Sequence, residues 1–238
     1  FGGGGGITFN NAGTFRKSSS TGTTNFSSTT LNNTGTVEVQ TGTLSLSSGG
    51  THTGSFSISS GKTLNFAGGA QSIGEGASFT GSGTVQVTGA GVNFTGTTNG
   101  ASISSSTTFN FSGGDLGGSG NLTVNGTMNW SSTGSVSTTS LTISSGANLN
   151  ISGTGNKSFR FGRIYNSGTT TWTETGIIRG GAGAIFDNQS GGVFDAQNDA
   201  EFQYDGGGGG GITFNNAGTF RKSSGSGTTN FSSTTFNN

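Results

Sequence analysis

The sequence predicts an all-β protein, a right-handed parallel β-helix (β-solenoid) with about nine rungs in each 205-residue repeat unit. Three observations support this fold class: a long internal duplication, a shorter recurrence within it, and strict alternation of apolar with small polar residues. The 238-residue chain has 50 Gly and no Pro or Cys. A right-handed coil is expected because crossovers between parallel strands strongly favour that hand.

The long duplication divides the chain into two parts. Residues 2–33 recur at 207–238, an offset of 205 residues, and 29 of the 32 aligned positions are identical. The differing pairs are Ser20/Gly225, Thr21/Ser226 and Leu31/Phe236. We therefore divide the chain into one complete solenoid unit, 1–205, and the start of the next near-identical unit, 206–238. Neither part carries a recognisable cap, so we expect a slice of a longer, extendable tandem array.

A shorter period lies inside the unit, and its spacing of 20 to 27 residues suits one coil of a parallel β-helix. No helical periodicity competes with it. Rungs are predicted to begin near Ile7, Leu31, Ser55, Ala77, Ala101, Asn121, Leu141, Phe161 and Ile185, with the next at Ile212.

Within each rung, apolar residues alternate with Ser, Thr or Asn, as in Val37/Val39 and Phe109/Phe111. A period of two points one side chain inward and the next outward. Gly, Asn and Ser clusters end each run and predict turns. A narrow interior shared by neighbouring rungs explains why only 26% of the residues are hydrophobic. Trp130 follows Met128 in the inward parity and is predicted to lie in the core.

Aligning successive rungs predicts which side chains stack. Residues 11–16 align with residues 33–38, which places Asn11 next to Asn33 and Arg16 next to Glu38. Stacked Asn side chains form amide hydrogen-bond ladders. The same reasoning predicts that Asp195 approaches Arg221 or Lys222. Further Asn residues of these structural ladders are Asn166, Asn188 and Asn216.

Composition excludes several classes of function. The formal net charge is zero, which argues against a nucleic acid or an anionic membrane as partner. The absence of Cys excludes disulfides and thiolate metal sites. No apolar run approaches the ~18 residues of a transmembrane helix, so no membrane span is expected in this segment. No cofactor is expected either.

The acidic residues of the last third form the one dense cluster of titratable groups, with Arg160, Arg163 and Arg179 on the preceding rungs. We interpret the cluster as charge balance between rungs. Two alternatives remain: a calcium site at Asp195, Asp199 and Glu201, and a glycosidase-type pair of carboxylates. The members of the cluster are Asp187, Asp195, Asp199, Glu201 and Asp205.

Few other residues in the sequence could support catalysis. His52, the single histidine, lies in a Gly-Thr-His-Thr context that predicts a surface turn, and no partner for a general base is identifiable. The Thr positions shift from rung to rung, which argues against a flat ice-binding face. We therefore expect no enzyme.

Three segments of the sequence resemble those of a known family of proteins: ITFNNAGTFRKSSSTGTTNF, NNTGTVEVQTGTLSLSSGG and GGVFDAQNDAEF. They resemble the repeats of giant bacterial surface and secreted β-helix proteins, which are adhesin-like or filamentous-haemagglutinin-like. The resemblance covers essentially the whole chain. It implies an extracellular or cell-surface location and a role in adhesion or in fibres, and it brings no catalytic residues.

Three hypotheses follow for the function. The first is a structural component of an extracellular bacterial fibre or stalk, whose partners are copies of itself, head to tail, as covalent units or as stacked subunits. The second is an adhesin that binds surface glycans through the solenoid wall. The third is a polysaccharide-degrading enzyme that depends on Asp195 and Asp199.

Overall fold

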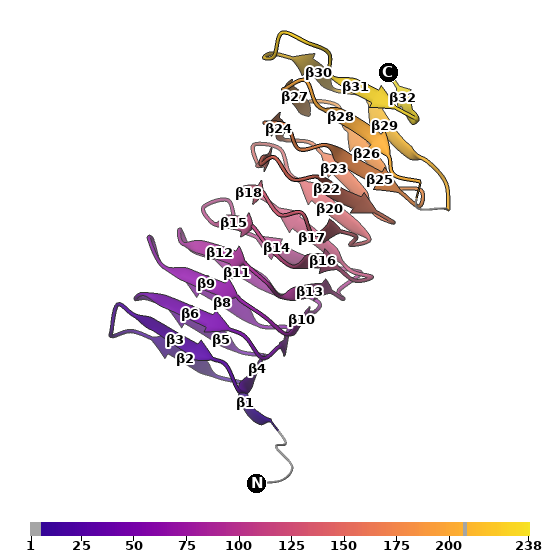
Figure 1. Ribbon diagram of the computed structural model, residues 1–238. Coiled ribbons are helices and arrows are strands. Elements are labelled where there is room, and N and C mark those ends of the chain that lie inside the picture. The colour runs from indigo at the N-terminus through magenta and orange to yellow at the C-terminus, as the bar shows by residue number, and fades with distance from the viewer. Residues whose placement is uncertain (1–5, 207–208) are drawn as a thin grey trace.

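The computed structural model describes residues 6–206 and 209–238 and confirms an all-β, right-handed parallel β-helix. The chain winds as coils stacked along one axis, with β1 and β32 at opposite ends of the stack (Figure 1). Each coil contributes one strand to each of three parallel sheets, which contain 11, 11 and 10 strands in the part of the chain that the structure describes. No helix in that part is long and apolar enough to cross a membrane.

The strands of the three sheets follow one another in strict rotation along the chain. Sheet A contains β1 (Ile7–Asn11), β4 (Thr29–Asn33), β7 (Gly50–His52), β10 (Ala70–Ile73), β13 (Gly91–Phe94), β16 (Asp115–Gly117), β19 (Ser135–Val136), β22 (Lys157–Arg160), β25 (Ile178–Gly181), β28 (Glu201–Tyr204) and β31 (Asn230–Ser232). Sheet B contains β2 (Thr14–Lys17), β5 (Thr36–Val39), β8 (Ser55–Ile58), β11 (Ser78–Thr80), β14 (Ala101–Ile103), β17 (Asn121–Val124), β20 (Ser140–Ile143), β23 (Arg163–Asn166), β26 (Ile185–Asn188), β29 (Ile212–Asn216) and β32 (Thr234–Asn237). Sheet C contains β3 (Thr23–Phe26), β6 (Thr43–Leu46), β9 (Thr63–Phe66), β12 (Thr84–Val87), β15 (Thr108–Phe111), β18 (Thr127–Trp130), β21 (Asn148–Ile151), β24 (Thr169–Thr173), β27 (Val193–Gln197) and β30 (Thr219–Lys222).

The alternation seen in the sequence fixes which side chains face inward. In β5, Val37 and Val39 are buried, whereas Thr36 and Glu38 are partly exposed. Each strand is short because the chain has to turn a corner before the next sheet, and the Gly, Asn and Ser clusters supply those corners. Met128 and Trp130 are both completely buried, as their parity predicted.

Aromatic rings form columns along the interior. The rings of Phe56 and Phe79 stack with centroids 5.2 Å apart, and those of Phe186 and Phe214 with centroids 5.1 Å apart. These spacings are close to the ~4.8 Å that separates neighbouring strands in a sheet. Rings on successive coils therefore pack face to face without disturbing the backbone pairing.

Two of the predicted rung boundaries are wrong. The starts from Ser55 to Ile212 all fall within two residues of the start of a sheet B strand, but Ile7 and Leu31 lie on strands of sheet A. The first two coils measure 22 and 19 residues by the pairing of Thr14 with Thr36 and of Thr36 with Ser55, instead of the predicted 24 and 24. The reason is that the same alternation marks the strands of every sheet, so it does not identify the sheet.

The start of the second copy continues the stack of the first unit. Strands β29, β30 and β31 pair in parallel with β26, β27 and β28. The pairing is in register, as it is between successive coils within the unit. We call this set of contacts the junction. The predicted division at 205/206 is a division of the sequence, and the strands described on either side of it belong to the same three sheets.

Two equivalent glycines allow the junction to be tested, because Gly218 turns a corner of the second copy as Gly13 does in the first. A Cβ at Gly218 would lie 2.4 Å from the carbonyl oxygens of Gln189 and Gly192, whereas a Cβ at Gly13 would meet no atom within 4 Å. We expect Gly218→Ala to cost about 1–3 kcal/mol, as overpacking does. Gly13→Ala should change the stability by less than about 0.5 kcal/mol. Denaturant unfolding, with hydrogen exchange of residues 212–238, measures both; equal effects would contradict the observed stacking.

Candidate functional site

Stacks of asparagine side chains line two corners of the coil. In the first, Asn11 Nδ2 donates to Asn33 Oδ1 at 2.8 Å. In the second, Asn166 donates to Asn188 at 2.8 Å and Asn188 donates to Asn216 at 2.7 Å. Asn33, Asn166 and Asn188 are almost completely buried. The predicted Asn neighbours thus form hydrogen-bonded ladders, and the second ladder crosses the junction.

The same amides also brace the following strand. Asn11 donates to the carbonyl oxygen of Thr36, and Asn188 donates to that of Thr219. An amide can do both because its NH₂ group has two donors. Asn166 Oδ1 has no partner, since the residue paired beneath it in sheet B is the apolar Ile143. The ladder therefore starts at Asn166 and extends toward the second copy.

The prediction that His52 lies in a surface turn is wrong. Its side chain is completely buried at the end of β7, where it takes the position of Asn33 on the next coil. Its Nε2 lies 3.0 Å from Gln71 Oε1. Burial lowers the pKa of His52, and the hydrogen bond with Gln71 opposes that effect only in part. His52 therefore acts as a neutral corner residue of the stack.

Ion pairs join different coils on the outer wall. Four of the five seen among the described residues join neighbouring coils, whereas Arg160–Asp205 reaches across one intervening strand, because β25 lies between β22 and β28 in sheet A. Arg16 lies 2.6 Å from Glu38 in sheet B, as predicted. The remaining pairs all involve the acidic cluster, which supports its interpretation as charge balance between rungs. These pairs are Arg160–Asp205, Arg163–Asp187 at 3.0 Å, Arg221–Asp195 at 2.7 Å and Lys222–Asp199 at 2.6 Å.

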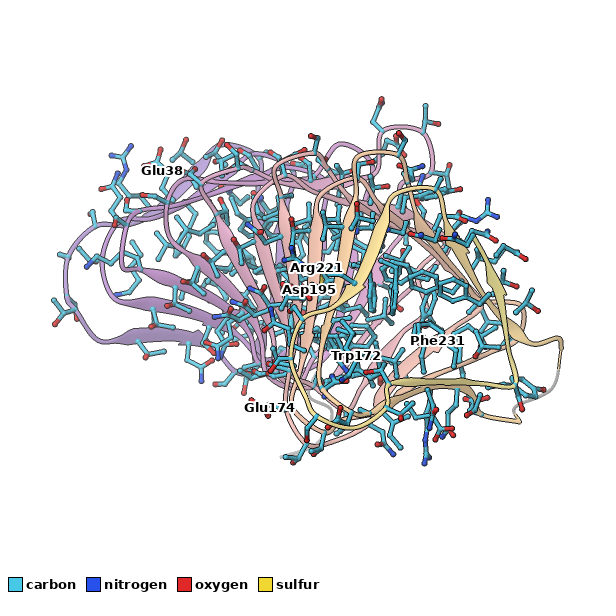
Figure 2. The ribbon with its side chains drawn as sticks, turned by 90° about the horizontal axis from the view of Figure 1, so that it is seen from above. Glu38, Trp172, Glu174, Asp195, Arg221 and Phe231 are labelled. Atoms are coloured by element: carbon cyan, nitrogen blue, oxygen red, sulfur yellow. The ribbon has the colours of Figure 1, made fainter. Side chains whose placement is uncertain are left out.

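Asp195 is the least exposed of these paired carboxylates. Figure 2 shows it beside Arg221, and its side chain is only 2% exposed. Burial by itself would raise the pKa of Asp195, but hydrogen bonds from Arg221, Ser223 and Gln197 outweigh it and lower the pKa to about 2. A carboxyl with that pKa is ionised at neutral pH, so it is unsuited to act as a general acid.

The calcium candidates are not brought together. Asp195 and Asp199 each face a cation, and Glu201 lies on β28 in a different sheet from Asp195. Within residues 6–206 and 209–238, no group of three or more His, Cys, Asp or Glu side chains could hold a metal ion.

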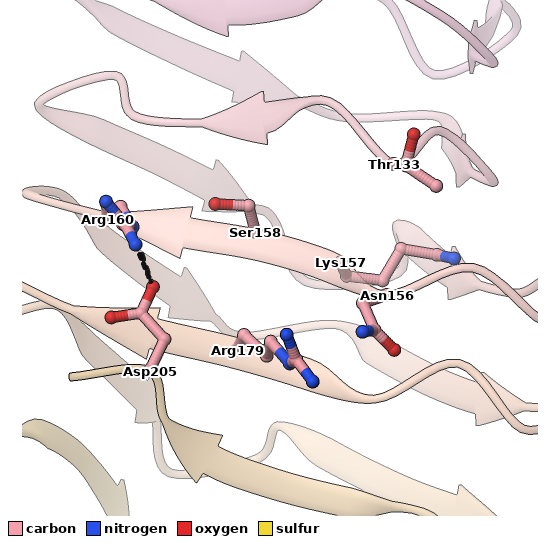
Figure 3. Close-up of a pocket in the computed structure, with 7 residues that line it drawn as sticks. All are labelled: Thr133, Asn156, Lys157, Ser158, Arg160, Arg179 and Asp205. Carbon is pink, nitrogen blue, oxygen red and sulfur yellow. Dashed lines mark hydrogen bonds and ion pairs between the residues drawn. The ribbon is translucent and has the colours of Figure 1, made fainter. Parts of the chain in front are cut away.

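A basic hollow lies over sheet A, with a volume of about 470 Å³ (Figure 3). Three cationic side chains line it against a single acid, Asp205, whose Oδ2 accepts a hydrogen bond from Arg160 at 2.7 Å. We call this feature the basic hollow. Its lining residues are Thr133, Asn156, Lys157, Ser158, Arg160, Arg179 and Asp205.

Lys157 is the one charged lining residue that the sequence interpretation overlooked. Its alternation with Phe159 puts it in the inward parity, and it is 1% exposed. The ammonium donates to the carbonyl oxygen of Gly155. Burial lowers the pKa of Lys157, and the nearby charge of Glu174 opposes that shift. A Lys in an inward parity was the signal that could have predicted a polar corner at this position.

Comparison with known proteins identifies no relative: no family model, curated protein or solved structure matches this chain.

The environment of Asp195 predicts that the stability of the fold depends on pH. Because its folded pKa lies below the ordinary value of 3.8, the carboxylate stabilises the fold above about pH 4 and loses that contribution as the pH falls through about 2. The contribution amounts to about 2 kcal/mol at neutral pH. Asp195→Asn should therefore lower the free energy of unfolding by about that amount at pH 7 and by much less at pH 2.

Denaturant titrations at both pH values provide the measurement. Asp199→Asn is the matched control, because Asp199 is 41% exposed and solvent screens its pair with Lys222, so the loss of this exposed pair should change the stability little at either pH. A loss in Asp195→Asn that is the same at pH 7 and pH 2 would mean that packing, and not charge, explains it.

Proposed function

We propose that the chain is a structural component of an extracellular bacterial fibre or stalk built from stacked β-solenoid repeats. The observation that carries the proposal is the junction. There the start of a second copy adds to the first unit through the contacts that hold neighbouring coils together within the unit. A unit that can receive its own copy in this way can be repeated along one axis.

The junction is a continuation of the core. The rings of Phe214, Phe220 and Phe231 in the second copy lie over rings of the first unit, with centroid separations of 5.1, 5.7 and 5.3 Å. Arg221 adds an ion pair to Asp195 and Asn216 extends the Asn ladder. Apolar burial, backbone pairing and charge therefore all favour the addition of the next unit.

Repetition in one direction gives length without closure. A head-to-tail contact whose operation does not close generates a filament. The partners in this proposal are copies of the same unit, joined covalently or as stacked subunits. The bacterial and extracellular parts of the proposal rest on the resemblance of the repeat phrases to those of giant surface proteins. A wall of Ser, Thr and Asn with few charges is compatible with exposure to solvent.

Chains in which residues 7–211 occur once, twice or three times before residues 212–238 test the proposal. One unit spans 28 strands in three sheets, so each added unit should lengthen the particle by about 45 Å at ~4.8 Å per coil. Small-angle scattering should show a constant cross-section and a maximum dimension that rises linearly. Native material labelled with an antibody should show thin fibres on intact cells. Compact particles, growing as a globular chain does, would refute the proposal.

A second candidate function is adhesion to glycans, and the basic hollow favours it. Arg160 and Arg179 present planar guanidinium groups at its surface, and such groups suit carboxylates and sulfates. The ligand class in this proposal is therefore an acidic glycan, held on the wall of sheet A.

A glycan array with the 238-residue chain tests adhesion. Acidic glycans should bind in preference to their neutral counterparts, and Arg179→Gln should weaken that binding. Lys62→Gln is the control, because Lys62 does not line the hollow. Equal binding by the two variants, or no binding at all, would remove this candidate while leaving the fibre proposal intact.

A further inference from the structure

The two copies of the repeated segment occupy different faces of the solenoid. Ile7–Asn11 forms β1 in sheet A, but the same five residues at Ile212–Asn216 form β29 in sheet B. The sequence TFRK forms β2 in sheet B and β30 in sheet C. Equivalent residues are thus displaced by one sheet, in the direction in which the chain winds.

The displacement follows from the number of strands in the unit. Ile7 opens β1 and Ile212 opens β29, so one 205-residue unit contains 28 strands. Three strands make one coil. Twenty-eight strands are therefore nine coils and one strand more. A unit of 27 strands would have returned each residue to its original face.

The repeated segment keeps its own geometry on both faces. Its three Phe rings form an edge-to-face triangle in the first copy, with centroids 5.6 to 6.0 Å apart, and again in the second, at 5.4 to 5.9 Å. The Asn11–Asn33 hydrogen bond of 2.8 Å becomes Asn216–Asn238 at 2.7 Å. The repeated segment is therefore accommodated equally well in both of its positions, which differ by one sheet.

The charges at the junction fit the displaced position. Arg221, the equivalent of Arg16, lies over Asp195 in sheet C. Without the displacement β30 would lie over β26, and Arg221 would then meet Asp187. That carboxylate already pairs with Arg163 of the coil below. In the observed arrangement Arg221 pairs with Asp195 and Arg163 pairs with Asp187, so each arginine has its own carboxylate.

We infer that successive units of the tandem array are rotated by one third of a coil about its axis, so that every patch of the wall moves to the next face from one unit to the next. The inference rests on the proposed tandem stack. The basic hollow, on sheet A in one unit, lies on sheet B in the following unit and on sheet C in the third. The pattern of side chains on any one face therefore recurs every three units, or 28 coils. This corresponds to an axial distance of about 134 Å at ~4.8 Å per coil.

The rotation determines how partners meet the fibre. A flat surface that touches one face meets a given patch only once in three units, whereas ligands that surround the fibre find it on every side. Two fibres that lie side by side cannot match identical patches along their whole length. The array is thus built for binding in all directions, with widely spaced contacts to any one surface.

Pairs of cysteines test the rotation, and the chain contains no cysteine of its own. Asp187→Cys with Asn215→Cys joins residues paired across sheet B, and Gln203→Cys with Ser232→Cys joins residues paired across sheet A. Neighbouring strands bring Cα atoms within the roughly 4.4–6.8 Å that a disulfide allows. Under mild oxidation both pairs should form intramolecular disulfides at least about tenfold faster than Asp187→Cys with Arg221→Cys, because only they are held at high effective concentration.

Arg16→Cys with Glu38→Cys serves as the positive control, since these residues are paired within the first copy. Rapid disulfide formation by the 187/221 pair, with no reaction of the other two, would overturn the rotation and leave the tandem stack standing. If only the control reacts, the second copy does not stack on the first unit, and both the rotation and the fibre proposal fail. Two pairs on different sheets protect the test against misfolding of one variant.

Discussion

The in-register stacking of parallel strands is the constraint on which the rest of the structure depends. A single coil has too few apolar side chains to enclose a core, and only the coils above and below complete it. Phe194 illustrates the point: it is completely buried, and its ring contacts Phe220 on the next coil, 5.7 Å away. Stability in such a protein is a sum of contacts between neighbours. A chain with only 26% hydrophobic residues can therefore remain ordered as long as every coil keeps its register.

The same constraint determines how buried polar side chains at the corners obtain their hydrogen bonds. A buried polar side chain has to be hydrogen-bonded, and in a solenoid the nearest partner is its own equivalent one coil away. Asparagine suits this position because it both donates and accepts, so identical residues satisfy each other along a ladder such as Asn166–Asn188–Asn216. Aspartate would place like charges beside one another, and leucine would leave the adjacent carbonyl oxygens unpaired. The ladders therefore reinforce the register that the core requires.

Much of the fold, and of the pairing of side chains between coils, could be predicted from the sequence, because a period of two and a recurring corner motif are direct consequences of the fold. The neighbours Asn11/Asn33, Arg16/Glu38 and Asp195/Arg221 all followed from alignment of one coil on another. What could not be predicted is which sheet a strand belongs to, because the three sheets use the same alternation. Ile7 and Ile212 have identical surroundings in sequence, yet they lie on different sheets. His52 and Lys157 were missed for another reason. Inward positions at corners admit polar residues when a carbonyl or an amide lies nearby, as Gly155 and Gln71 do.

The distribution of charge has a physical explanation in the similarity of the coils. Neighbouring coils are alike enough that a strand displaced by one sheet would still find apolar partners and backbone hydrogen bonds, so the core discriminates weakly between alternative positions. Charged side chains discriminate better, because a wrong position leaves a buried carboxylate such as Asp195 without its cation. Of the five ion pairs in the described part of the chain, two span the junction, Arg221–Asp195 and Lys222–Asp199. Their position there, where near-identical copies have the greatest opportunity to misalign, is consistent with a role in selecting the register at which one unit follows another.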